Sequence, residues 1–169
     1  MADPARVELQ PVGEALLDQL VAAALDGAAA DEVTPAVTPG EGWTPERVEW
    51  LRAFHRDRRP GLDGPAAEAT WAVVEVAGRA RVVGGARLRR LAEPGVVEVG
   101  LWLARDARGR GLGAEALGLV VDRARAAGAR RVVADTAPGN RGALAALRSV
   151  GFATRVDREG VRAQLPLNG

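Results

Sequence analysis

Hydrophobic and polar positions change their spacing along the first part of the chain. They alternate over residues 5–12, which predicts a short strand, and the apolar residues of 13–25 then follow helical spacing. Residues 26–44 lose any pattern and contain several prolines and glycines, which predicts a loop. A second helix is expected over 45–59, because Thr44 is a suitable N-cap and is followed by proline.

The middle of the chain changes to a period of two residues. Alternation over 70–76, 81–88 and 96–103, with turn residues between the runs, predicts three consecutive strands of an antiparallel meander. The pair Gly84-Gly85 inside the second strand predicts a β-bulge or a close approach of two backbones.

Helical spacing returns after these strands. A helix is predicted over 112–127, then a strand at 131–136, a short helix at 140–150 and a closing hairpin at 152–165. Because a helix connects the strand 96–103 to the strand 131–136, these two strands are expected to be parallel.

The order of elements, β-α-α-β-β-β-α-β-α-β-β, predicts an α/β fold of the α+β kind with one mixed sheet. We expect residues 1–169 to form a single domain, because a chain of 169 residues can bury a core of its own. The absence of cysteine excludes disulfides and a thiol nucleophile. With a single histidine a multi-histidine metal site is excluded as well, so no metal is expected.

Charge and hydropathy narrow the partners. The 23 basic residues are all arginine and stand against 22 acids, so the net charge of +1 gives no general case for nucleic acid. A weaker alternative is a nucleic-acid binder that uses the arginines of 52–59 and 123–131. The N-terminus has no apolar leader and no run approaches a membrane span, so we expect a cytoplasmic protein that binds no membrane.

The segment Arg108-Gly109-Arg110-Gly111-Leu112-Gly113 separates a predicted strand from the long helix that follows. Glycine permits positive φ and lets a ligand approach the backbone. The first amides of a helix lack helical partners and carry partial positive charge, which together make an anion site that phosphate often occupies. A turn that binds nothing is the alternative.

Two nucleotide-binding fingerprints do not fit this segment. The Walker loop ends in Gly-Lys-Ser/Thr, and the chain contains no lysine. The dinucleotide fingerprint has a different glycine spacing and opens the first βα unit of a parallel sheet, whereas this loop follows a meander in mid-chain.

The motif Arg108-x-x-Gly111-x-Gly113, together with Asp135-Thr136 and the later block from Asn140 to Gly151-Phe152, resembles the GCN5-related N-acetyltransferases (GNAT). The resemblance covers residues 5–165 through the order of elements. The segment from Glu98 to Gly113 is most similar to the branch that includes ribosomal-protein alanine acetyltransferases and many bacterial relatives. The resemblance implies a GNAT-like fold with a splayed central sheet and acetyl-CoA as the acyl donor.

In this family the pyrophosphate of coenzyme A lies on the loop amides, and the pantetheine arm pairs with the backbone of the strand before the loop. Asn140 is also expected to contact the cofactor, although a plain helix N-cap explains it equally well. The positions so implied are Leu101, Trp102, Leu103, Arg108, Gly109, Arg110, Gly111, Leu112, Gly113 and Asn140.

Acetyl transfer to an amine needs a base, because an alkylamine is mostly ammonium at neutral pH. Glu98 is the candidate: it is an acid in an otherwise apolar strand, where several family members hold a catalytic glutamate. A solvated, outward-facing glutamate is the alternative. Many relatives protonate the leaving thiolate with a tyrosine, which this chain lacks, so Ser149 is the candidate acid, with Thr136 or water as substitutes.

The acceptor is expected to be a primary amine on a small molecule or a peptide, attacking directly in a ternary complex of a monomer or homodimer. Trp43, Trp50 and Trp71 are candidates for the acceptor site. His55, beside three arginines, is expected at a solvated helix end, with Leu51 on the buried side. The alternative function is a non-catalytic module that binds or senses acyl-CoA.

Overall fold

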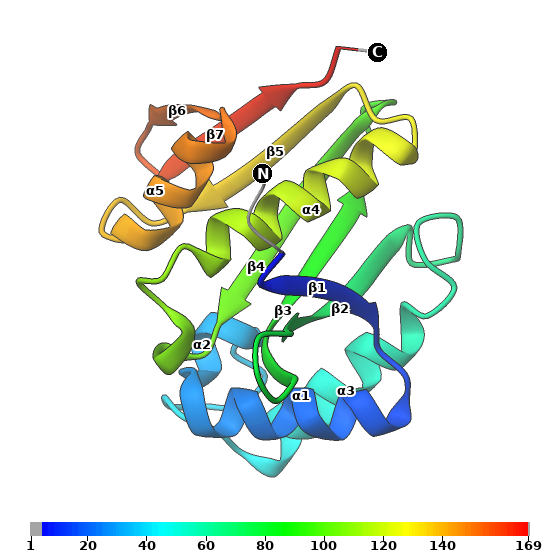
Figure 1. The fold of residues 1–169 in the computed structure, drawn as a ribbon, viewed down its shortest axis with the longest axis vertical. Helices are drawn as coiled ribbons and strands as arrows, with labels where there is room; N and C mark the ends of the chain where they lie inside the picture. The colour runs from blue at the N-terminus through cyan, green and yellow to red at the C-terminus, as the bar shows by residue number, and fades with distance from the viewer. Residues whose placement is uncertain (1–4, 169) are drawn as a thin grey trace.

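A seven-stranded mixed sheet runs through the protein, and a computed structural model describes residues 5–168 (Figure 1). The strand order is β1-β2-β3-β4-β5-β7-β6. The strands are β1 Val7–Pro11, β2 Glu68–Glu75, β3 Arg81–Arg90, β4 Val96–Leu103, β5 Arg131–Thr136, β6 Ala153–Val156 and β7 Val161–Pro166. The helices are α1 Glu14–Gly27, α2 Ala30–Val33, α3 Pro45–Asp57, α4 Leu112–Ala126 and α5 Arg141–Val150, with a 3-10 turn at Arg105–Ala107.

Two hydrophobic cores lie on opposite faces of the sheet. Alternate residues of one strand divide between them: Val73 joins the core under α4, and Ala72 and Val74 join the core under α1 and α3. Figure 1 shows α4 crossing one face of the sheet while α1 and α3 lie together at the far end of the molecule. No helix within residues 5–168 is long and apolar enough to cross a membrane.

Strands β4 and β5 are parallel, as predicted, but they pair over only three residues. Val96, Val97 and Glu98 lie opposite residues 131–133, and the pairing stops there. Residues 99–103 continue to pair with β3, and β5 continues to pair with β7 as far as Thr136. The sheet therefore splays open between the two strands beyond Glu98, which is the splayed centre that the resemblance implied.

Two local predictions can be compared directly with the backbone. The glycine pair marks both a bulge and a close approach of two backbones. The register between β2 and β3 shifts at Val83, and a Cβ on Gly84 would collide with the backbone carbonyl oxygen of Trp102. Residues 26–44 were expected to form a loop but include the short helix α2, whose four residues are too few to show a hydrophobic period.

Helix α3 buries polar residues that its sequence pattern did not reveal. Thr44 caps the helix as predicted, accepting a hydrogen bond from the Arg47 amide. The buried stripe is Arg47, Leu51 and His55, spaced four residues apart. The prediction that His55 lies at a solvated helix end is wrong: it is 3% exposed and its Nδ1 lies 2.9 Å from Thr70 Oγ1.

Candidate functional site

The glycine segment 108–113 connects the end of β4 to the start of α4, at the open end of the splay. Gly109 and Gly111 have φ angles of 75° and 79°, which other residues adopt only with strain. Gly111 occupies the N-cap position of α4, so this helix has no side-chain cap. In contrast, Thr44 and Asn140 cap α3 and α5. The first amides of α4 are therefore available to an anion.

Both arginines of the segment are engaged by carboxylates. Arg108 donates to the Leu103 carbonyl at 3.0 Å and to Glu32 of α2 at 2.6 Å. Arg110 donates twice to Glu75 at the end of β2, at 2.7 and 3.1 Å. The hydrogen bond from Arg110 is the main reason why the pKa of Glu75 lies below its usual range. The arginines fasten the loop to two other elements, and the backbone supplies the open donors.

Arg6, the residue before β1, contacts this loop, and the sequence analysis did not predict the contact. Its guanidinium donates to the Arg110 carbonyl at 2.6 Å and to Glu115 in the first turn of α4 at 3.0 Å. Burial raises the pKa of Glu115, but hydrogen bonds from the Arg6 and Val7 amides and the Arg6 side chain outweigh it, so the pKa is lowered. No sequence signal precedes this contact, because it joins residues more than a hundred positions apart.

Glu98 lies at the vertex of the splay, on the face covered by α1 and α3. It is the last residue of β4 that pairs with β5. Its side chain is 15% exposed, so it is not solvated and outward-facing. Arg87 and Arg89 both donate to Oε1, each at 3.0 Å. Oε2 has no hydrogen-bond partner within residues 5–168.

The remaining polar candidates lie on or beside α5. Ser149 is exposed and donates to the Ala146 carbonyl of its own helix at 2.9 Å. Asn140 caps α5 by accepting from the Ala143 amide at 3.1 Å, so the N-cap role is present. Thr136 ends β5, on the far wall of the splay.

The tryptophans do not gather at one place. Trp43 donates to the Ala28 carbonyl at 2.9 Å and, with Trp50, packs against the core under α1 and α3. Trp102 of β4 joins the same core. Trp71 packs against the opposite core. The structure therefore brings Trp43, Trp50 and Trp102 to the face that carries Glu98 and places Trp71 elsewhere.

Acidic residues surround a cavity of about 190 Å³ beyond the end of β5. Asp135, Asp157 and Glu159 line it, and Arg162 pairs with Asp135 at 3.1 Å. Across residues 5–168 no group of three His, Cys, Asp or Glu side chains is arranged to hold a metal ion.

Comparisons with known proteins agree with this geometry. A family model described as an acetyltransferase (GNAT) domain matches residues 6–153. No curated protein matches the sequence. A ribosomal L7/L12 α-N-protein acetyltransferase, RimL, solved with coenzyme A, has a TM-score of 0.72 at 15% identity, covering 97% of each chain.

Two further solved structures are similar. A structure from Vibrio cholerae, provisionally named a ribosomal-protein-serine acetyltransferase, has a TM-score of 0.70 at 14% identity. The alignment covers 98% of this chain and 96% of that one. The yncA protein of Salmonella typhimurium, solved with acetyl-CoA, has a TM-score of 0.68 at 17% identity. The alignment covers 96% of this chain and 95% of that one.

Proposed function

Because the chain belongs to the GNAT acetyltransferase family and is an acetyl-CoA-dependent acyltransferase, we propose that it acetylates a primary amine by direct attack in a ternary complex. The absence of cysteine favours direct transfer, since the chain has no thiol to carry an acyl group. The observation that carries the proposal is the splay between β4 and β5, with an uncapped helix at its open end.

The loop suits the pyrophosphate of coenzyme A, and the splay suits its pantetheine arm. The pyrophosphate of coenzyme A would lie on the amides from Gly109 to Gly113, where the helix dipole and the open backbone favour an anion. The pantetheine arm would hydrogen-bond to the backbone of residues 101–103, which β5 does not pair with. The thioester then lies near Glu98, where the two strands separate.

Glu98 Oε2 is proposed to accept the proton that the amine must lose. Arg87 and Arg89 hold Oε1 and fix the carboxylate, so the unpartnered oxygen can reach an ammonium or a bridging water. The neutral amine attacks the thioester carbonyl carbon and the carbon–sulfur bond breaks. The proton that the nitrogen loses as the amide forms passes through water to the departing thiolate. Ser149 is not assigned this proton, because its hydroxyl is bound within α5.

The acceptor is proposed to be cationic before it reacts. Asp135, Asp157 and Glu159 line the cavity at the end of β5, which forms one wall of the splay. Negative charge at this position would attract an ammonium and raise its local concentration. A mass-spectrometric screen of small amines, amino acids and peptide N-termini, each with acetyl-CoA, identifies the acceptor directly.

Thiol release from acetyl-CoA in the presence of the acceptor tests the role of Glu98. Glu98→Gln keeps the shape and removes the base, so turnover should fall by about 10²–10⁴-fold, the usual contribution of general base catalysis. Glu68→Gln is the matched control: Glu68 belongs to the same arginine network, but Arg58 and Arg87 occupy both of its oxygens. Equal turnover in wild type and Glu98→Gln would remove Glu98 as the base.

A further inference from the structure

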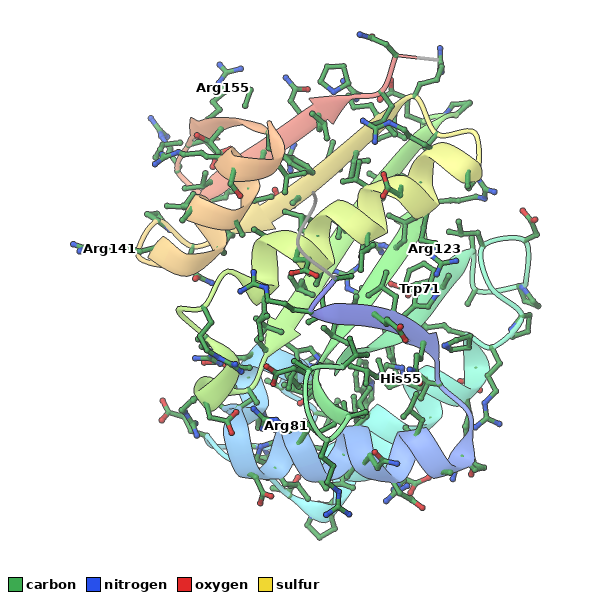
Figure 2. The ribbon with its side chains drawn as sticks, in the orientation of Figure 1. His55, Trp71, Arg81, Arg123, Arg141 and Arg155 are labelled. Carbon is green, nitrogen blue, oxygen red and sulfur yellow. The ribbon has the colours of Figure 1, made fainter. Side chains whose placement is uncertain are left out.

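A cavity of about 450 Å³ lies at the edge of the sheet where β1 ends. Pro11 is the last residue of β1 that pairs with β2, opposite Trp71, so β2 continues through residues 68–70 without a neighbour on that side. The C-terminal end of α3, including His55, closes the space. Figure 2 shows His55 and Trp71 near the end of β1.

His55 presents one ring nitrogen to this cavity. Only 3% of the residue is exposed, and Nδ1 lies 2.9 Å from the Thr70 hydroxyl. Nε2 has no partner within residues 5–168. Yet in that same part of the chain Arg47 Nε is the one side-chain nitrogen or oxygen that is both sealed and unpartnered. Nε2 is therefore not sealed, and the open space that His55 lines is the cavity.

Two arginines make the lining positive. Arg58 holds Glu68 through Nε at 2.6 Å, and Arg59 holds Glu14, but no acidic residue itself lines the cavity. Glu68 also pairs with Arg87, and Glu14 also pairs with Arg56, so each single negative charge is divided between two arginines. Nη2 of Arg58 and Nη1 of Arg59 have no acceptor among the described residues.

We propose that this cavity binds a small monocarboxylate with a flat apolar body. The three unpartnered donors of His55, Arg58 and Arg59 would bind the carboxylate, since guanidinium groups match its planar geometry. The body would extend past the open edge of β2 to Pro11 and to Trp71, which packs on the α4 side of the sheet. The cavity volume of about 450 Å³ lies within the usual range for small-ligand sites.

The tautomer of His55 is consistent with this role. Burial, helped by the nearby Arg58 charge, lowers the pKa of His55 to about 4, so the ring is neutral near pH 7. A neutral ring donates through one nitrogen only. When the Thr70 hydroxyl donates to Nδ1, Nε2 carries the hydrogen and donates into the cavity.

The cavity is separate from the cleft proposed to bind acetyl-CoA. Thr70 pairs with Arg87 of β3, and Arg87 pairs with Gly100 of β4, so strands β3 and β4 lie between the cavity and the splay. The proposal therefore does not depend on the proposed reaction, and coenzyme A should not compete for the site.

Nitrogen-15 NMR of the histidine ring tests the proposal, because His55 is the single histidine and needs no assignment. The probe is benzoate, and its uncharged analogue benzamide is the control, both with coenzyme A present to occupy the cleft. Benzoate should shift the Nε2 signal saturably at millimolar concentration, and benzamide should shift it at least about tenfold more weakly, as expected for loss of a charged partner.

Two arginine variants provide a matched pair. Arg56 and Arg59 both bind Glu14, but only Arg59 lines the cavity. Arg59→Gln should weaken benzoate binding about tenfold, and Arg56→Gln should leave it within twofold of wild type. The position of the His55 signal without ligand shows that each variant is folded. An unshifted signal, an equal response to benzamide, or an equal loss in both variants would overturn the proposal.

Discussion

Lowering the pH should destabilise this protein through His55. The pKa of its ring is lowered from 6.5 to about 4 in the folded state, mainly by burial and secondarily by the charge of Arg58. Between these two values the unfolded chain binds more protons than the folded protein does. The contribution of His55 to stability is therefore fully present above pH 6.5 and is lost as the pH falls towards 4.

The size of this effect follows from the shift in pKa. A shift from 6.5 to about 4 corresponds to about 3 kcal/mol in all, and about 2 kcal/mol of it should be lost between pH 7 and pH 5. For a chain of this length the loss lowers the melting temperature by about 4–8 °C. Few ordinary carboxylates titrate in this interval, so the histidine should dominate it.

Urea unfolding at several pH values measures the free energy of unfolding, and an NMR titration of the histidine ring in parallel measures the pKa of His55. His55→Asn is the control, because its amide can still reach Thr70 in place of Nδ1 and does not titrate. The variant should be less stable at pH 7 and should change little down to pH 5. A measured histidine pKa near 6.5, or the same pH slope in both proteins, would refute the reasoning.

Two further predictions concern backbone and charge. Gly111→Val should abolish coenzyme A binding in calorimetry, because a φ of 79° costs a residue with a side chain about 1–2 kcal/mol and the change reshapes the loop. The control is Gly118→Ala, which should keep the affinity because a methyl group there meets nothing within 4 Å. Equal affinity in both variants would contradict the anion site. Asp31→Ala should lower the free energy of unfolding by about 3 kcal/mol, because it leaves the fully buried Arg47 without its carboxylate partner. The control is Asp18→Ala at the exposed pair with Arg52, which should cost less than about 1 kcal/mol. Similar losses in both variants would show that burial of the arginine is not the cause.

The fold was predictable because its elements carry local signals. Alternation defines the strands of the meander, Thr44 and proline mark the start of α3, and glycine at position 151 ends α5 with a φ of 105°. These signals depend on neighbours in sequence. The parallel pairing of β4 and β5 also follows from chain order, because a helical crossover returns the strand in the same direction.

The polar interior was not predictable in the same way. Arginine is almost never fully buried unless it is paired, and histidine is intermediate in burial. Distant residues provide the partners here: Asp31 for Arg47 and Thr70 for His55. Their spacing of four residues on either side of Leu51 places them on the same face of the helix. A prediction of burial from sequence nevertheless gives more weight to residue type than to spacing. The docking of Arg6 on the glycine loop had no sequence signal at all.

The glycine loop is fastened before any ligand arrives. Arg108 ties it to α2, and Arg110 ties it to the end of β2, through ion pairs whose arginine side chains are 42% and 44% exposed. A loop ordered in advance loses little conformational entropy on binding, which favours affinity without further contacts. Exposed ion pairs are weakened by salt. Added salt should therefore act twice on coenzyme A binding, by screening the anion and by loosening the loop that receives it.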